Sequence, residues 1–529
     1  MVKYVTLVLV VVLLIVAGLL PVLAMLAQSI IADGRLSLDA YATVLRSRNQ
    51  WALLWHSIAL SSLTTVMATA IGMPLGVLLG KTDLPFRRAF LVLFTIPLLI
   101  PPYIMAVAWF HVLGRGKLVA RLCGDAVAAV TSDLLFGLPG CVLVLSSVFM
   151  PVVMLLTMAF LKTVNPRLEE AGRNMTGWWG VLKGITVPLI LPGVLLSALL
   201  TFLLTLGEFG VPHYLRFNVY PAETFSQFSA FYDFRAATAG AMPLAAITLA
   251  ALVVERTCLR RRTYEIQLAS QAGEILSVPL GRFRGLCLLL VTMLCLLVVI
   301  LPLLILLAAA SSLGAYWQAL TQAGDSLVRS LLYAGTAASI LTIVGFFAGY
   351  LIHYQALPFW LTIDSLTIFL FALPSTVIGV GLILLWNRPA TNFIYATPIV
   401  IMCGLLAQYC AITSRITAST LTEIPASMDE AAQMVGAGWV RRVACITAPL
   451  AKKGLLAGWV VAFIFCLRDM GISMMVYPPG LDTLPVRTFT LMANGPTDLI
   501  AALCMIMVLG ALTPLGILAL VFKGSRFRA

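Results

Sequence analysis

Long apolar runs limit most strongly what this chain can fold into. Several are continuous and long enough to cross a bilayer as a helix, which takes about 20 residues. Of the 529 residues, 61% are hydrophobic and 10% are charged, whereas soluble domains carry about 25% charged residues. A large soluble enzyme is therefore excluded. A membrane β-barrel would show short alternating segments instead of continuous runs. The sequence predicts an all-α polytopic membrane protein.

The apolar runs predict about twelve transmembrane helices, six in each half of the chain. The first run is longer than the core of a signal peptide, about 7–15 residues, so we expect it to be a retained span. Of the 34 Lys and Arg residues, 22 fall on one side if the N-terminus is cytoplasmic. This bias predicts that both termini are cytoplasmic. The predicted spans are 5–30, 57–80, 89–113, 139–162, 189–209, 236–254, 285–310, 330–352, 359–386, 396–414, 454–475 and 499–521.

The net charge of +13 could suggest nucleic acid binding, but the basic residues lie between the apolar runs, where they set topology. The four histidines are scattered and the ten cysteines form no CxxC pair, so no metal site is predicted. The stretch GVLLGKTD at 76–83 has one residue too few for a phosphate loop. We therefore expect no catalytic residue, no cofactor and no nucleic acid partner for this chain.

Two polar stretches between apolar runs share one order of residues. The first polar loop, 169–188, reads EEAGRNMTGWWGVLKGITVP, and the second polar loop, 429–449, reads DEAAQMVGAGWVRRVACITAP. Their final residues, Pro188 and Pro449, lie 261 positions apart, which is close to half the chain. Each loop falls between the fourth and fifth span of its half. The sequence thus predicts two homologous six-helix units, 1–254 and 285–529, joined by a cytoplasmic linker, 255–284.

Each polar loop is expected to form a short helix followed by a turn. In the second loop Glu430 lies near the positive N-terminal end of such a helix, Gly436 and Gly438 turn the chain, and Pro449 starts the next span. A short helix with small residues suits a partner's groove. An ordinary interhelical loop is the alternative, and two copies at matching positions disfavour it.

The loops resemble the EAA loop of bacterial binding-protein-dependent ABC importer permeases of the MetI-like type. That pattern is E-A-A-x-x-x-G, about nine residues, then I-x-x-P. In the first copy Gly172 takes the third position and Thr176 the glycine position, with Gly177 next, and the copy is one residue shorter from acid to proline. The positions that match are Glu430, Ala431, Ala432, Gly436, Ile446 and Pro449 in the second copy, and Glu170, Ala171, Ile185 and Pro188 in the first.

The resemblance implies a mechanism and its partners. A periplasmic solute-binding protein would deliver solute to a permease in the bacterial inner membrane, and a cytoplasmic ABC ATPase dimer, a separate chain that binds the ATP, would dock on both loops. Residues 373–389 and 467–492 look most like the iron(III) branch of the fused two-unit permeases. Thiamine, a phosphonate or a polyamine are the alternative solutes. The ATPase-coupling residues implied are Glu170, Ala171, Gly172, Gly177, Pro188, Glu430, Ala431, Ala432, Gly436 and Pro449.

Four residues are candidates for the solute path. Glu208 and Asp469, again 261 positions apart, lie near the outer end of the fifth span of each half. An acid there is costly unless it lines a path or is satisfied structurally, and both interpretations remain open. Pro97, followed by Pro101 and Pro102, interrupts the third span, and Pro374 interrupts the ninth. These prolines either kink a helix or line a wet path.

An ion-driven secondary transporter is the competing class of function. It would be expected to carry acid or His relays within the membrane and no repeated cytoplasmic loop. The chain shows the reverse pattern. A membrane-bound enzyme is disfavoured because no nucleophile, metal or acid pair cluster is evident on one face.

Overall fold

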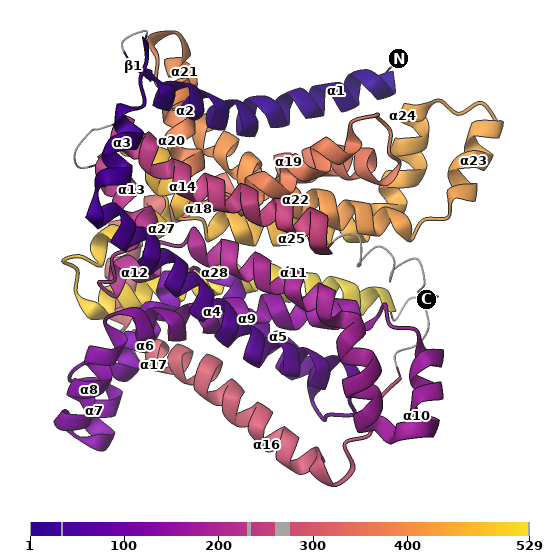
Figure 1. Ribbon diagram of the computed structural model, residues 1–529, viewed down its shortest axis with the longest axis horizontal. Helices are drawn as coiled ribbons and strands as arrows, with labels where there is room; N and C mark the ends of the chain where they lie inside the picture. Colours follow the sequence, from indigo (N-terminus) through magenta and orange to yellow (C-terminus); the bar gives the residue numbers. More distant parts are fainter. Residues whose placement is uncertain (1, 33–34, 230–233, 260–275, 311, 527–529) are drawn as a thin grey trace. The chain divides into compact units, whose positions relative to one another are not determined.

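The computed structural model describes residues 2–32, 35–229, 234–259, 276–310 and 312–526, which are almost entirely helical (Figure 1). In these residues, the strands are an antiparallel pair of two residues each, β1 (Ile31–Ala32) and β2 (Arg35–Leu36), and one isolated parallel bridge joins Thr82 and Val278. Ten described helices are long and apolar enough to span a membrane, or twelve if each of two bent pairs is one span. The predicted all-helical class and the number of spans are confirmed.

Two compact units divide the chain. Unit 1 comprises Met1–Arg46, Thr224–Ala245 and Ser312–Ala529, and unit 2 comprises Ser47–Glu223 and Ala246–Ser311. The helices of unit 1 are α1 (Val2–Leu14), α2 (Leu20–Ile30), α3 (Asp39–Arg46), α18 (Leu313–His353), α19 (Trp360–Ala372), α20 (Ser375–Trp386), α21 (Asn392–Tyr395), α22 (Ile399–Thr422), α23 (Ala426–Met434), α24 (Trp439–Arg442), α25 (Ala448–Leu467), α26 (Gly471–Val476), α27 (Leu484–Leu491) and α28 (Thr497–Arg526).

Unit 2 repeats this order of helices. The lengths agree closely: α5 and α19 have 13 residues each, α9 and α22 have 24, and α11 and α25 have 20. Helices α13 (Tyr220–Ser229) and α14 (Phe234–Val254) have residues in both units. The helices of unit 2 are α4 (Arg48–Lys81), α5 (Arg87–Leu99), α6 (Pro102–Leu113), α7 (Leu118–Cys123), α8 (Asp125–Leu135), α9 (Leu138–Leu161), α10 (Pro166–Val181), α11 (Val187–Leu206), α12 (Gly210–Tyr214), α16 (Arg284–Cys295) and α17 (Leu301–Ala309).

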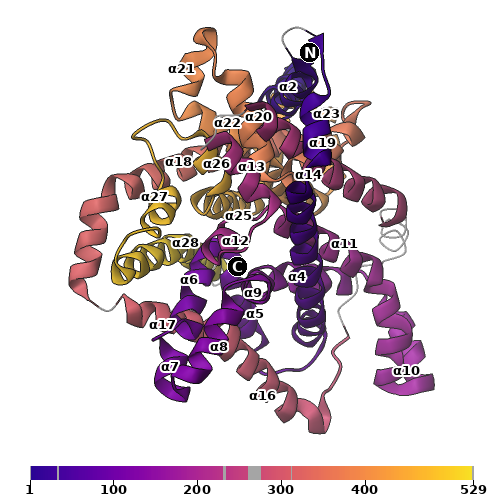
Figure 2. The same cartoon turned by 60° about the vertical axis from the view of Figure 1, so that its left-hand side comes forward.

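The first span of each half packs in the unit formed mainly by the other half. Helices α1 and α2, joined by the π-turn η1 (Ile15–Leu19), belong to unit 1, and α16 and α17, joined by the π-turn η5 (Leu296–Ile300), belong to unit 2. Figure 2 shows α17 beside α6. The packing units therefore differ from the predicted units 1–254 and 285–529. Those boundaries describe the internal duplication and stay a prediction, and residues 260–275 of the linker lie outside the described residues.

Glycine allows the exchanged first span to approach closely in unit 1. A Cβ added at Gly381 in α20 would lie 2.7 Å from the backbone oxygen of Pro21 in α2. A Cβ added at Gly18 would lie 2.4 Å from the Leu370 side chain. Small residues at membrane helix contacts let backbones pack closely in this way. Gly381 therefore serves helix packing and does not break α20.

The third and ninth spans are each a sharply bent helix pair. Helix α5 and the segment Pro102–Cys123 meet at 104°, and α19 and α20 meet at 105°. Pro101 and Pro374 are the N-caps of α6 and α20. The residue before each is extended, with ψ 154° at Ile100 and 138° at Leu373, because a following proline disfavours helical backbone. The break in the third span thus lies at Pro101, whereas Pro97 is buried inside α5.

Candidate functional site: two polar loops

The two polar loops have the same build in their separate units. The first begins within α10, bends at Gly177, and continues through the π-turn η2 (Leu182–Thr186) into α11. The second begins in α23, turns at Gly436, and continues through α24 and the π-turn η7 (Val443–Thr447) into α25. Figure 1 shows α10 and α23 each connected to the long helices of its own unit. Pro188 and Pro449 stand in the first turn of α11 and α25.

Each loop turns at a glycine with left-handed backbone. The φ angle is 70° at Gly177 and 80° at Gly436. A Cβ added at either glycine would have nothing within 4 Å, so the backbone angle, not space, requires glycine there. Gly177 therefore turns the first loop in the same way as Gly436 turns the second. Gly172 has a different role, because an added Cβ would lie 2.4 Å from the Ile185 side chain, so it packs α10 against η2.

The EAA acids face outward in both loops. Glu170 and Ala171 are exposed in α10, and Glu430 and Ala431 are exposed in α23, whereas Ala432 is half-buried. These side chains lie on the surface of their own unit and are available to a partner.

The acid immediately before each EAA acid is tied into its unit, which sequence reasoning missed. Glu169 is 1% exposed and forms an ion pair with Lys81, the last residue of α4. The same carboxylate accepts a hydrogen bond of 2.7 Å from Thr186 Oγ1 in η2. In the second loop Asp429 accepts a hydrogen bond of 3.1 Å from Arg442 Nη1. The doubled acids, Glu-Glu and Asp-Glu, were the available signal.

A tryptophan anchors the second loop on the long helix of unit 1. Trp439 Nε1 donates a 3.0 Å hydrogen bond to the hydroxyl of Tyr350 near the end of α18, and the two rings meet edge to face with centroids 6.0 Å apart. Burial raises the pKa of the neighbouring Tyr354, so its phenol stays neutral near Asp429. Each loop is therefore fixed to the C-terminal end of its unit's long helix, α4 or α18, through different chemistry.

Large apolar side chains point outward from both loops. Met175 is 87% exposed and Met434 is 88% exposed, and each stands two residues before the glycine with positive φ. Trp179 and Val435 are similarly exposed beside them. An exposed apolar group rimmed by polar residues marks an interaction surface. Sequence reasoning missed these residues, although their matched position relative to the glycine was visible.

The two path acids cap short helices. Glu208 Oε1 accepts from the backbone N–H of Gly210 at 2.9 Å, at the start of α12. Asp469 accepts from the N–H and hydroxyl of Ser473, both at 3.0 Å, and from the Tyr409 hydroxyl at 3.0 Å. This geometry gives each carboxylate a structural role, and a role in the solute path stays a prediction. The acid two residues before a glycine, in both copies, was the local signal.

Within the described ranges, no three His, Cys, Asp or Glu side chains are grouped so that they could hold a metal ion.

The comparisons with known proteins agree with this arrangement. The family described as "Binding-protein-dependent transport system inner membrane component" matches residues 72–263, which include the first polar loop. A ferric transport system permease protein of Actinobacillus pleuropneumoniae is 23% identical over 460 residues, covering 82% of this chain and 66% of that protein. A relative from Haemophilus influenzae with a similar description is 23% identical over 462 residues, covering 83% and 72%.

A shorter relative matches about a third of the chain. The molybdenum transport system permease protein of Escherichia coli K12 is 28% identical over 183 residues, covering 34% of this chain and 78% of that protein. The helical architecture and the two matching loops agree with these similarities: residues 72–263 match the family of binding-protein-dependent transport system inner membrane components, and four-fifths of the chain is similar to permease proteins of ferric transport systems.

Proposed function

We propose that a separate ATPase dimer docks on the two polar loops and drives this permease, with both termini in the cytoplasm and a solute-binding protein at the outer face. The observation that carries the proposal is the two-sided build of each loop. Glu170 and Glu430 face outward, and each loop also exposes a methionine. Glu169 holds the first loop to Lys81 of α4, whereas Asp429 pairs with Arg442 inside the second loop, which Trp439 holds to α18. In each loop, a residue that faces a partner thus directly follows a residue that bonds within the protein.

The anchors provide a route for force from the ATPase to the membrane helices. When ATP closes the dimer, movement of α10 would be passed to α4 through the buried pair of Glu169 and Lys81. Movement of α24 would be passed to α18 through Trp439 and Tyr350. Because a buried ion pair loses several kcal/mol when it is separated, α10 and the end of α4 move as one body. The bent pairs α5–α6 and α19–α20 are the elements whose angle could change between states.

Ferric iron is the solute that we propose. The relatives that cover more than four-fifths of this chain are described as ferric transport permeases, whereas the molybdenum permease covers about a third. Cells lacking this permease should lose uptake of radioactive ferric iron supplied as a weak chelate, with molybdate uptake unchanged. Loss of molybdate or thiamine uptake with normal iron uptake would contradict the assignment.

Docking is tested by co-purification of an ATPase with the detergent-extracted permease. Glu170→Arg and Glu430→Arg should each lower the amount of ATPase recovered about tenfold, because each replaces an outward acid with a cation at the contact. Glu423→Arg is the matched control: an exposed acid just after α22, outside both motifs. It should leave recovery unchanged.

Three results would change the interpretation. Full recovery with both motif variants would contradict docking on these loops. Unequal losses would show that the loops contribute differently. Absence of any ATPase from the wild-type sample, under conditions that keep related complexes intact, would favour an ion-driven secondary transporter.

A further inference from the structure

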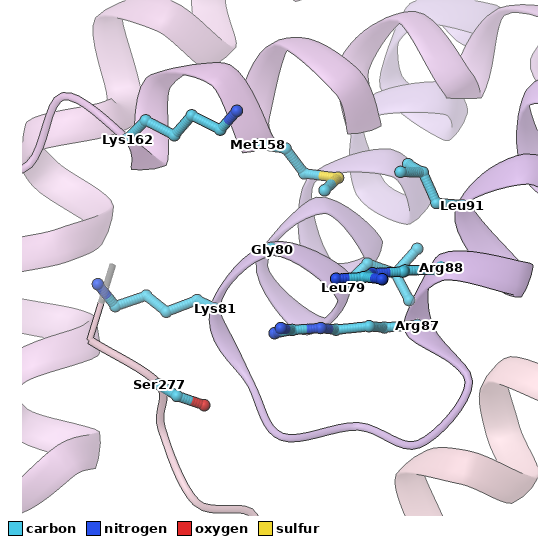
Figure 3. Close-up of a pocket in the computed structure, with 9 residues that line it drawn as sticks. All are labelled: Leu79, Gly80, Lys81, Arg87, Arg88, Leu91, Met158, Lys162 and Ser277. Carbon is cyan, nitrogen blue, oxygen red and sulfur yellow. The ribbon is translucent and has the colours of Figure 1, made fainter. Parts of the chain in front are cut away.

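A cavity of about 300 Å³ lies at one end of unit 2, where α4 ends, α5 begins and α9 ends. Four cations line it, as Figure 3 shows, together with an apolar wall and one linker residue. The lining residues are Leu79, Gly80, Lys81, Arg87, Arg88, Leu91, Met158, Lys162 and Ser277.

Among the described residues, three of the four cations have no carboxylate partner. Lys81 is engaged with Glu169, and Figure 3 shows its amino group turned away from the arginines. The guanidinium groups of Arg87 and Arg88 extend in the same direction from α5, with Lys162 on the opposite side. No described carboxylate forms an ion pair with these three side chains, and Arg87 donates only to the backbone oxygen of Thr82, at 3.3 Å.

The position of the arginines makes their charge unfavourable without an anion. Both stand in the first turn of α5, which contains no acidic residue. The helix macrodipole is positive at that end and favours anions there, not cations. Asp83, four residues before Arg87 in the sequence, accepts a hydrogen bond of 2.9 Å from the backbone N–H of Leu280. An anion bound between α5 and Lys162 would compensate all of these charges together.

Main-chain hydrogen bonds hold the segment next to Ser277 in place beside the cavity. Val278 N–H donates to Lys81 O at 2.8 Å, and Asp83 N–H donates to Val278 O at 3.4 Å. The segment that carries Ser277 is thus paired with the α4–α5 connection in a parallel bridge between Thr82 and Val278. Lys81 is buried at this cavity, whereas Arg87, Arg88 and Lys162 are exposed, so an anion can reach them from outside.

The matched helix ends of unit 1 carry different residues. Arg87 and Arg88 begin α5, whereas Trp360 and Leu361 begin the equivalent α19. Lys162 follows α9, whereas Glu423 follows the equivalent α22. If these cations served only to orient membrane spans, both repeats would be expected to carry them. The positive charge at these helix ends is therefore specific to the cavity of unit 2 and is not a shared feature of the two repeats.

We propose that this cavity binds a phosphate group, supplied by the headgroup of an anionic phospholipid. Basic pockets between membrane helices on the cytoplasmic side bind such headgroups, and Leu79, Leu91 and Met158 provide an apolar wall for the start of the acyl chains. The choice of leaflet rests on the proposed orientation with cytoplasmic termini. Because Lys81 both lines the cavity and anchors α10 through Glu169, a bound phosphate also lies next to the first polar loop.

Native mass spectrometry of the purified full chain, titrated with phosphatidylglycerol, tests the proposal. Phosphatidylcholine, which has a phosphate but no net charge, is the lipid control, and inorganic phosphate measured by calorimetry is the soluble probe. The double variant Arg88→Gln with Lys162→Gln should bind phosphatidylglycerol about thirty-fold more weakly, since each cation near an anionic headgroup contributes about a factor of five. The control double variant, Arg282→Gln with Arg284→Gln, removes two exposed cations from the same unit outside the cavity. It should bind normally.

The outcomes separate the possible sources. If only the Arg88→Gln, Lys162→Gln variant loses phosphatidylglycerol binding, and inorganic phosphate does not bind, the lipid headgroup is supported as the ligand. Binding of inorganic phosphate that depends on the same two residues and displaces the lipid supports the phosphate site but overturns the lipid source. The site is overturned if both double variants bind phosphatidylglycerol equally weakly, or if the wild type does not prefer phosphatidylglycerol to phosphatidylcholine. The lipid measurement uses the permease alone. Lipid binding can therefore be absent while ATPase docking is confirmed, and lipid binding can be confirmed while ATPase docking is absent.

Discussion

Neighbouring acids in the two polar loops have opposite surroundings. Glu169 is buried against Lys81 and Thr186, and the next residue, Glu170, is exposed. Asp429 is held by Arg442, and the next residue, Glu430, is exposed. Successive side chains on a helix point about 100° apart, so a doubled acid places one carboxylate inward and one outward. In such a pair of acids, the first carboxylate can bond within the protein while the second faces outward toward a partner.

Removing the inward acid should destabilise the permease, while removing the outward one should not. Glu169→Gln leaves the ammonium of Lys81 buried without its partner, which costs about 3–5 kcal/mol. We expect a clearly lower thermal unfolding temperature in detergent for Glu169→Gln and an unchanged one for Glu170→Gln. The double variant Glu169→Gln with Lys81→Met should recover most of the loss, because it removes the unpaired charge.

Equal unfolding temperatures for the two single variants would contradict a buried charge pair. Failure of Lys81→Met to rescue Glu169→Gln would mean that the Glu169 carboxylate acts mainly through Thr186.

At the scale of elements, each loop depends on one backbone angle. Gly436 has φ 80° and Gly438 has φ −63°, and neither would have an atom within 4 Å of an added Cβ. The two glycines thus differ in backbone conformation, whereas both have room for a Cβ atom. A left-handed conformation costs a residue with a Cβ about 1–2 kcal/mol.

Gly436→Ala should therefore change the course of the second loop, and Gly438→Ala should not. We expect Gly436→Ala to lower ATPase stimulation by the permease several-fold in proteoliposomes, because the exposed Met434 two residues earlier would be displaced. Gly438→Ala is the matched control and should keep normal stimulation. If both variants behave alike, the positive φ of Gly436 is not what sets the loop.

Sequence reasoning located the helices of the loops and the interruption of two spans, because glycine and proline act locally. It noted Thr176 at the glycine position of the first copy with Gly177 next, and the structure places the positive φ at Gly177. It placed the interruption of the third span at Pro97 as well as at the following prolines. The helix instead breaks at Pro101, because Ile100 before it is extended while Pro97 stays within α5.

At the scale of the whole molecule, each unit takes its first span from the other half of the chain. Helices α1 and α2 belong to unit 1 with α18–α28, and α16 and α17 belong to unit 2 with α4–α12. The approach of α2 to Gly381 leaves no room for a side chain there. Each half of the sequence therefore lacks a helix that its own packing unit requires.

Separated halves should depend on each other for stability. A fragment of residues 276–529 expressed alone is expected to be degraded, because the surface around Gly381 and Leu370 that receives α1 and α2 is uncovered. Co-expression with residues 1–46 should raise its level in the membrane fraction several-fold, measured by immunoblot after sodium carbonate extraction. A version of residues 1–46 with Gly18→Trp is the control and should not rescue, since a Cβ at Gly18 already meets Leu370 at 2.4 Å. Equal levels of the fragment with and without residues 1–46 would contradict the exchange.

The sequence by itself determined that the chain is helical, spans a membrane about twelve times and carries two matched polar loops. These properties follow from apolar run length, charge placement and the local action of glycine and proline. Only the tertiary structure decided which unit each first span joins, that Lys81 meets Glu169 across 88 positions, and that Arg87, Arg88 and Lys162 surround one cavity. Contacts between distant segments depend on how helices pack, and an apolar helix surface fits more than one neighbour in a membrane.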